Sequence, residues 1–98
     1  MNNRITQIID VQPFSIKCKW TNGEIRLVDF LSFQKNIGGG KVFEKIMQPE
    51  IFKQVKLDEI SHTLYWADML PYRDYDGSTK IGALDFCPDV LYFQSVAV

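Results

Sequence analysis

The 98-residue sequence predicts a single α+β domain, and three observations carry this prediction. A β-branched segment and an alternating segment precede an Asn22-Gly23 dipeptide, which indicates an antiparallel meander. Two short stretches then have apolar residues at helical spacing, and strand-like segments follow them. The expected order is a three-stranded antiparallel meander, two short helices, a second β-hairpin, a long loop and a short C-terminal helix.

The first strand is expected over residues 4–11, which are rich in β-branched side chains, and Pro13 ends it because proline has no N–H to donate. The second strand has the clearest pattern in the chain. Its apolar residues alternate with Ser15, Lys17 and Lys19, which predicts one buried face. That face is expected to hold Phe14, Ile16, Cys18 and Trp20.

Asn22-Gly23 predicts a two-residue hairpin loop in which both residues have positive φ. Such a loop fixes the register with the return strand, residues 24–30. The expected pairs are Trp20 with Ile25, Cys18 with Leu27, and Ile16 with Asp29. Ile25 and Leu27 should then be buried. Asp29 does not suit a buried face, so we expect its carboxylate to cap the next turn.

Residues 31–36 are expected to lead into a glycine connector, Gly38-Gly39-Gly40. A phosphate-binding loop would continue with Lys-Ser or Lys-Thr, whereas Lys41-Val42 follows here. The first helix is predicted from the spacing of Val42, Phe43, Ile46 and Met47. Pro49 should open the second helix, because proline suits the first helical position.

The second hairpin is expected from segments 55–58 and 63–66, joined across residues 59–62. Residues 67–80 contain Pro71, Asp74, Asp76 and Gly77, which predicts a long loop. Such loops are uncommon in small domains and are functional or mobile. A terminal helix is expected to begin at Cys87-Pro88, with Leu91 as its core contact.

The charge balance argues against nucleic acid as a partner of this chain alone. Eleven basic and twelve acidic residues give a net charge of −1, and the basic residues form no stripe. A membrane span would need about 20 consecutive apolar residues, and no such run is present. The N-terminus lacks the features of a signal peptide, so a cytoplasmic location is expected. Cys18 and Cys87 are then free thiols, with a redox pair as the alternative.

No set of residues predicts catalytic, cofactor-binding or metal-binding chemistry. His62 is the sole histidine and lies in a predicted turn, where an exposed side chain is expected. Asp68, Asp74 and Asp76 suggest a calcium loop, but the twelfth position counted from Asp74 is Asp85 rather than Glu, and the flanking helices are missing. A solvated loop is the simpler interpretation.

Tyr72, Arg73 and Tyr75, in the predicted 67–80 loop, give the best functional lead. Tyr and Arg are enriched at protein–protein contacts because they supply large contact areas. The tyrosine rings could equally fold back and cover the sheet while their hydroxyls stay in water. Partner contact and packing both remain open from the sequence.

The order of these features resembles a family of small bacterial proteins known as domain of unknown function 2442. The resemblance covers most of the chain and rests on motifs at Phe14–Asp29, Val42-Phe43, Pro49–Phe52, Val55–Asp58, Leu64–Trp66 and Leu84–Tyr92. The family implies an α+β fold without an established activity, and some members carry a helix-turn-helix segment after this domain. This chain ends at Val98, too soon for that segment, and has extra residues at about 67–80.

The sequence therefore favours a non-enzymatic protein-interaction or accessory regulatory module, with another protein or a second copy in a homodimer as the partner. A DNA-associated regulatory protein, by analogy with the longer relatives, is the alternative. A small enzyme is disfavoured, because the titratable residues are isolated along the chain.

Overall fold

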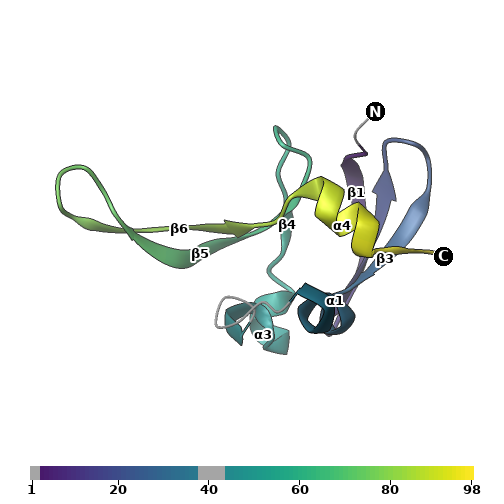
Figure 1. Cartoon of the computed structure of the whole chain (residues 1–98), viewed down its shortest axis with the longest axis horizontal. Coiled ribbons are helices and arrows are strands. Elements are labelled where there is room, and N and C mark those ends of the chain that lie inside the picture. The colour runs from purple at the N-terminus through teal and green to yellow at the C-terminus, as the bar shows by residue number, and fades with distance from the viewer. Residues whose placement is uncertain (1–2, 38–43) are drawn as a thin grey trace.

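Figure 1 shows the computed structural model of the chain, which describes residues 3–37 and 44–98. The α+β class is confirmed: one antiparallel sheet has the order β1-β2-β3-β7 and a second has the order β4-β5-β6. The strands are β1 (Ile5–Gln12), β2 (Ser15–Trp20), β3 (Ile25–Asp29), β4 (Lys56–Leu57), β5 (Leu64–Arg73), β6 (Thr79–Asp85) and β7 (Val96–Ala97). The helices are α1 (Phe30–Ile37), α3 (Pro49–Phe52) and α4 (Pro88–Gln94).

The predicted meander is present as β1, β2 and β3. β1 ends at Gln12, directly before Pro13. Ile16, Cys18 and Trp20 are buried on one face of β2, while Lys19 is exposed on the other. The period-2 pattern therefore identified the buried face of this strand correctly.

The predicted hairpin register is wrong by one residue. The loop has three residues rather than two: the N–H of Gly23 donates to the carbonyl of Trp20 (2.9 Å), and the N–H of Trp20 donates to the carbonyl of Glu24 (2.9 Å). Within this loop only Gly23 has a positive φ, at 87°. This is the three-residue hairpin loop in which a turn is followed by a left-handed glycine.

The extra loop residue reverses the faces of β3. Ile16 lies opposite Val28, and Cys18 lies opposite Arg26. Val28 is therefore buried, whereas Ile25 is exposed and Leu27 is half-buried. A one-residue shift moves every side chain of a strand to the other face, which is why one wrong loop length misplaced the whole set.

Asp29 caps the following turn, as predicted. Its carboxylate accepts hydrogen bonds from the backbone N–H of Leu31 (3.0 Å) and from the Ser32 hydroxyl (3.3 Å). Residues 31–36 were expected to form a connector, which is wrong, because they belong to α1. The cap and the burial of Phe30 and Phe33, three residues apart, explain the helix.

The other predicted helices are confirmed where the structure describes them. Residues 44–46 are helical, and Ile46 is buried. Gly38-Gly39-Gly40, Val42 and Phe43 lie outside the described residues. Pro49 opens α3, and α4 begins at Pro88 with Leu91 buried.

The predicted long loop at 67–80 is wrong, whereas the hairpin before it is confirmed. β4 pairs with β5 through Lys56–Tyr65 and Leu57–Leu64. β5 then continues to Arg73, and β6 returns from Thr79. The connection repeats the first hairpin loop: the N–H of Gly77 donates to the Asp74 carbonyl (3.0 Å), the N–H of Asp74 donates to the Ser78 carbonyl (2.9 Å), and Gly77 has φ 86°.

Aromatic side chains form the centre of the core. The ring of Phe30 packs against those of Phe33, Phe52, Trp66 and Phe86 at centroid distances of 5.3–5.7 Å. The indole N–H of Trp66 donates to the carbonyl of Phe52 (3.1 Å). The core thus joins α1, α3 and the base of β5, and the rest of β5 and β6 extends away from it (Figure 1).

Candidate functional site

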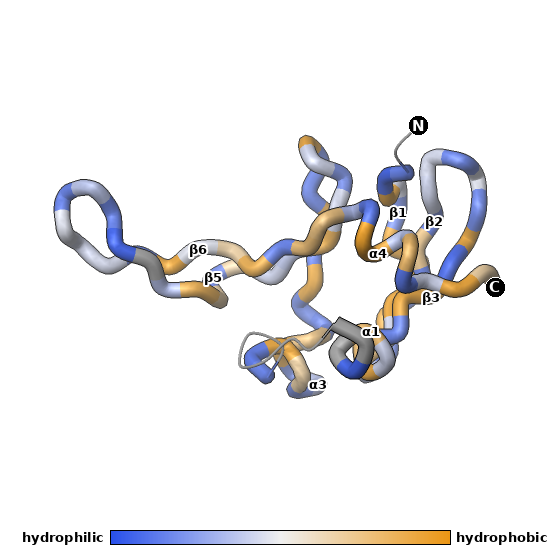
Figure 2. The backbone as a smooth tube through the Cα atoms, in the orientation of Figure 1, coloured by the Kyte–Doolittle hydropathy of each residue, from blue (hydrophilic) through white to orange (hydrophobic). Residues whose placement is uncertain are grey.

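The part of the β5–β6 hairpin that leaves the body is the most distinctive surface of the molecule (Figure 1). We call residues 70–82 the arm. The molecule measures 45 × 26 × 22 Å, and the arm lies along the longest of these axes. Figure 2 shows a hydrophilic tip on the arm, with hydrophobic stretches closer to the body.

The arm begins at an irregularity in β5. The register with β6 shifts between Trp66 and Leu70, and within this stretch Asp68 has a positive φ of 57°. The Lys45 ammonium donates to the carbonyl of Met69 (3.0 Å), so the irregular backbone is tied to the body. Irregularities of this type bend a strand and redirect it. This one marks the junction between the buried base of β5 and the arm.

Hydrogen bonds accepted by two aspartate side chains order the tip of the arm. Asp74 forms an ion pair with Lys80 (2.6 Å) and accepts the backbone N–H of Tyr75 (2.8 Å). Asp76 accepts the hydroxyl (2.6 Å) and backbone N–H (2.9 Å) of Ser78. The bond to Lys80 lowers the pKa of Asp74, and the bonds to Ser78 lower the pKa of Asp76. Both carboxylates are therefore charged and engaged at neutral pH.

The predicted contact residues lie together at the outer end of the arm. Tyr75, in the tip loop, is fully exposed, and Arg73 is exposed at the end of β5. The packing alternative, which concerned the tyrosine rings, is therefore wrong for Tyr75. Tyr72 lies in β5 opposite Lys80, and its side chain is outside the described part of the chain.

Two further exposed apolar residues of the arm were missed from the sequence. They are Ile81, which is 60% exposed, and Pro71, which is also exposed and lies directly opposite Ile81 across the ribbon. The signal that could have found them is Asp76-Gly77, since Asp-Gly between alternating segments indicates a hairpin as Asn-Gly does. The pair adds apolar surface to the same projecting element as Tyr75.

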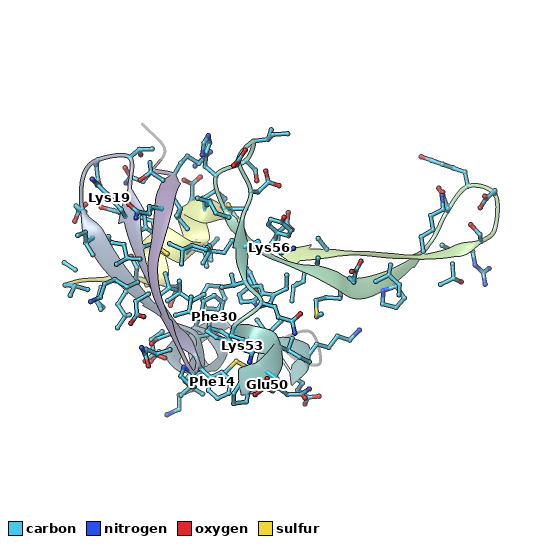
Figure 3. The ribbon with its side chains drawn as sticks, turned by 180° about the vertical axis from the view of Figure 1, so that it is seen from behind. Phe14, Lys19, Phe30, Glu50, Lys53 and Lys56 are labelled. Carbon is cyan, nitrogen blue, oxygen red and sulfur yellow. The ribbon has the colours of Figure 1, made fainter. Side chains whose placement is uncertain are left out.

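A pocket of about 230 Å³ lies between the end of β1 and α3. Its lining is Val11, Gln12, Pro13, Pro49, Glu50, Phe52 and Lys53. Glu50, on α3, and Lys53, the residue that follows this helix, lie near Phe14 (Figure 3) and form an ion pair (2.7 Å) that lowers the pKa of Glu50. The pocket is smaller than the roughly 300–1,000 Å³ usual for ligand sites. Its charged groups are already paired with each other.

A polar cluster beneath α4 is engaged in holding the fold. The Arg26 guanidinium pairs with Glu24 (2.9 Å), donates to the Ser95 hydroxyl (2.6 Å) and lies 4.4 Å from the centre of the Tyr92 ring. Glu24 also accepts the Tyr92 hydroxyl, and this bond, with the one from Arg26, lowers its pKa. These contacts fix α4 on the first hairpin, and each charged group has its partner within the cluster.

The remaining candidates do not assemble into a reactive site. His62 is exposed, as predicted. Cys18 is buried, which raises the pKa of its thiol to about 12, and Cys87 is exposed at the start of α4. Across residues 3–37 and 44–98, no group of three or more His, Cys, Asp or Glu side chains is placed to hold a metal ion.

None of the helices in the described ranges is both long enough and apolar enough to cross a membrane. Comparisons with known protein families, curated proteins and solved structures find no match to this chain. The resemblance to domain of unknown function 2442 therefore stays a prediction, and the geometry of the arm carries the functional argument.

Proposed function

We propose that this protein is a non-enzymatic interaction module and that the arm is its contact element. The observation that carries the proposal is the fully exposed Tyr75 at the tip of a ribbon that projects from the body. Tyr residues dominate many interfaces because the ring gives a large contact area at a small entropy cost. Arg73 and Ile81 add a guanidinium and an apolar side chain to the same element.

The build of the arm also supports a contact role. An isolated two-stranded ribbon is only marginally stable in water, because neither face is covered. Here the ion pair of Asp74 with Lys80 and the Asp76–Ser78 bonds hold the tip in one shape. Ordering the tip before binding lowers the entropy cost of association. An exposed ribbon with an ordered tip is better suited to bind a protein surface than to bind a small-molecule ligand.

The proposal is tested by affinity capture from a lysate of the source cells. The parent protein is compared with Tyr75→Ser and with the control Phe93→Ser, which removes another exposed ring from α4, 82% exposed. We expect the same protein to be retained by the parent and the control and to be lost with Tyr75→Ser. Equal retention by all three chains would contradict a role for the arm. Circular dichroism and melting temperature check that Tyr75→Ser leaves the body folded.

A further inference from the structure

The hydrogen-bond pattern of the arm shows which backbone groups point outward. The backbone N–H of Asp74 donates to the carbonyl of Ser78, so the backbone groups of this hydrogen-bonded pair point toward each other across the ribbon. Paired residues alternate along an antiparallel ladder between bonded and non-bonded positions. Pro71 with Ile81, and Arg73 with Thr79, therefore occupy non-bonded positions. Their backbone groups point to the two outer edges of the ribbon.

The two edges differ in their capacity to accept another strand. On the β5 edge, the outward position at Pro71 has no N–H to donate, and proline is one of the devices that protect strand edges. On the β6 edge, Thr79 and Ile81 both present an outward N–H and carbonyl. β6 is also the last strand of its sheet. We call the β5 edge blocked, because one of its two outward positions, Pro71, lacks a donor, and the β6 edge open, because both of its outward positions keep one.

We propose that the open edge of β6 pairs with β6 of a second copy of this chain, in an antiparallel arrangement about a two-fold axis. The inference rests on the proposed contact role of the arm and adds a second copy of the chain as the partner of its β6 edge. It joins the two arms into one four-stranded ribbon, β5-β6-β6-β5, whose outer edges are both the blocked β5 edge. Association therefore stops at the dimer. Two-fold dimers are also the commonest closed assembly.

The sequence of β6 fits this self-pairing when the axis passes through Ile81. Ile81 then lies opposite its own copy, and two side chains that are each 60% exposed cover one another. Thr79 lies opposite Ala83, and Lys80 opposite Gly82. The register places no like charges opposite each other, which would oppose pairing. Its centre is apolar, and each flanking pair contains one small residue, Ala83 or Gly82.

Cross-linking tests this register. In a Cys87→Ser background, which removes the exposed thiol, Ile81→Cys should give a covalent dimer on mild oxidation. Residues in a bonded antiparallel pair have Cα atoms about 5.5 Å apart, within the roughly 4.4–6.8 Å that a disulfide spans. Ile60→Cys in the same background is the control, since Ile60 is 93% exposed in a turn of the body. A dimer yield at position 81 no higher than at position 60 would overturn the proposed register.

Light scattering after size exclusion tests the choice of edge. The parent should be a dimer at micromolar concentration, and Ile81→Pro should be a monomer, since it removes an outward N–H while leaving the β5–β6 bonds intact. Ile81→Lys, which keeps the backbone donor and adds an edge charge, should weaken the dimer in the same direction. Pro71→Thr should produce species larger than a dimer, because it opens the second edge.

A monomeric parent, or a dimer that survives both Ile81 variants, would overturn the inference. Neither result bears on a foreign partner at Tyr75, which the capture experiment decides separately.

Discussion

Phe30 connects three parts of the fold through a single side chain. It follows the capping residue Asp29, is buried, and contacts aromatic rings from α1, α3 and β5. Aromatic pairs at these distances contribute about 0.5–1.5 kcal/mol each beyond the area that they bury. The stability of the body therefore depends strongly on this residue.

We predict that Phe30→Ala lowers the free energy of unfolding by about 3–5 kcal/mol, the usual cost of emptying a phenylalanine site in a core. Urea unfolding followed by tryptophan fluorescence measures the change, since Trp66 packs on this ring at 5.5 Å. Phe93→Ala, at an exposed site on α4, is the control and should change the free energy by no more than about 0.5 kcal/mol. Similar losses for the two variants would contradict the assignment of Phe30 to the centre of the core.

Two hairpins of the chain are closed by the same type of three-residue loop but have different surroundings. Thr21-Asn22-Gly23 joins β2 and β3, where Trp20 and Val28 are buried. Tyr75-Asp76-Gly77 joins β5 and β6 at the exposed tip of the arm. In both loops the glycine has a positive φ, 87° and 86°, and a Cβ there would meet nothing within 4 Å. The cost of adding a side chain is therefore in the backbone alone.

We predict that Gly23→Val and Gly77→Val impose a similar backbone strain of about 1–2 kcal/mol but have different consequences. Gly23→Val should lower the free energy of unfolding of the whole domain by this amount, since its hairpin is part of the core. Gly77→Val should mainly open the arm, because elements with little buried surface unfold locally. Urea unfolding measures the first effect and amide hydrogen exchange at residues 70–82 the second. An equal loss of global stability in both variants would show that the arm unfolds together with the body.

In both the body and the arm, hydrogen bonds hold several acidic groups in their charged form. The pKa of Glu24 is lowered by hydrogen bonds from Tyr92 and Arg26, and that of Asp58 by the backbone N–H groups of Ser61 and Ile60. Asp74 and Asp76 in the arm are lowered as well. These groups bind protons more readily in the unfolded chain than in the folded one, so they link folding to pH.

We predict that the melting temperature is nearly constant from about pH 7 to pH 5 and decreases at lower pH. A lowered pKa stabilises the fold above the ordinary pKa of the group, 4.5 for Glu24 and 3.8 for Asp58, and the stabilisation is lost as the pH falls through the folded value. Glu24→Gln should make the decrease shallower, since it removes one of these groups. A melting temperature that rises below pH 4.5, the ordinary pKa of Glu24, would contradict the assignment.

We also predict that this chain binds duplex DNA weakly, if at all, at physiological salt. A net charge of −1 without a basic stripe gives little release of counterions from phosphates, which supplies most non-specific affinity. Fluorescence anisotropy with a labelled random duplex, repeated at two salt concentrations, measures the binding. Micromolar affinity that decreases steeply with salt would favour the DNA-associated alternative over the interaction module.

The sequence determined the features that depend on neighbours along the chain. Alternation placed Ile16, Cys18 and Trp20 on the buried face of β2, and Pro49 marked the start of α3. The Asp29 carboxylate was expected to cap the turn that follows it, and it does so. Each follows from the period of a strand, the missing N–H of proline or a side chain's reach to nearby amides. The α+β class follows from these local patterns together.

The tertiary structure alone decided which segments face each other and which face water. Because the first hairpin loop has three residues instead of two, Val28 is buried in place of Leu27. Local hydrophobicity does not decide between these two registers. Likewise, Pro71 and the aspartates around residue 75 indicated a loop, although proline is compatible with an edge strand and Asp-Gly with a hairpin. The composition of Tyr72 to Tyr75 suited both packing and contact, and the direction in which the arm leaves the body exposed Tyr75. Pairing and exposure depend on distances in space between residues far apart in sequence, which no local period contains.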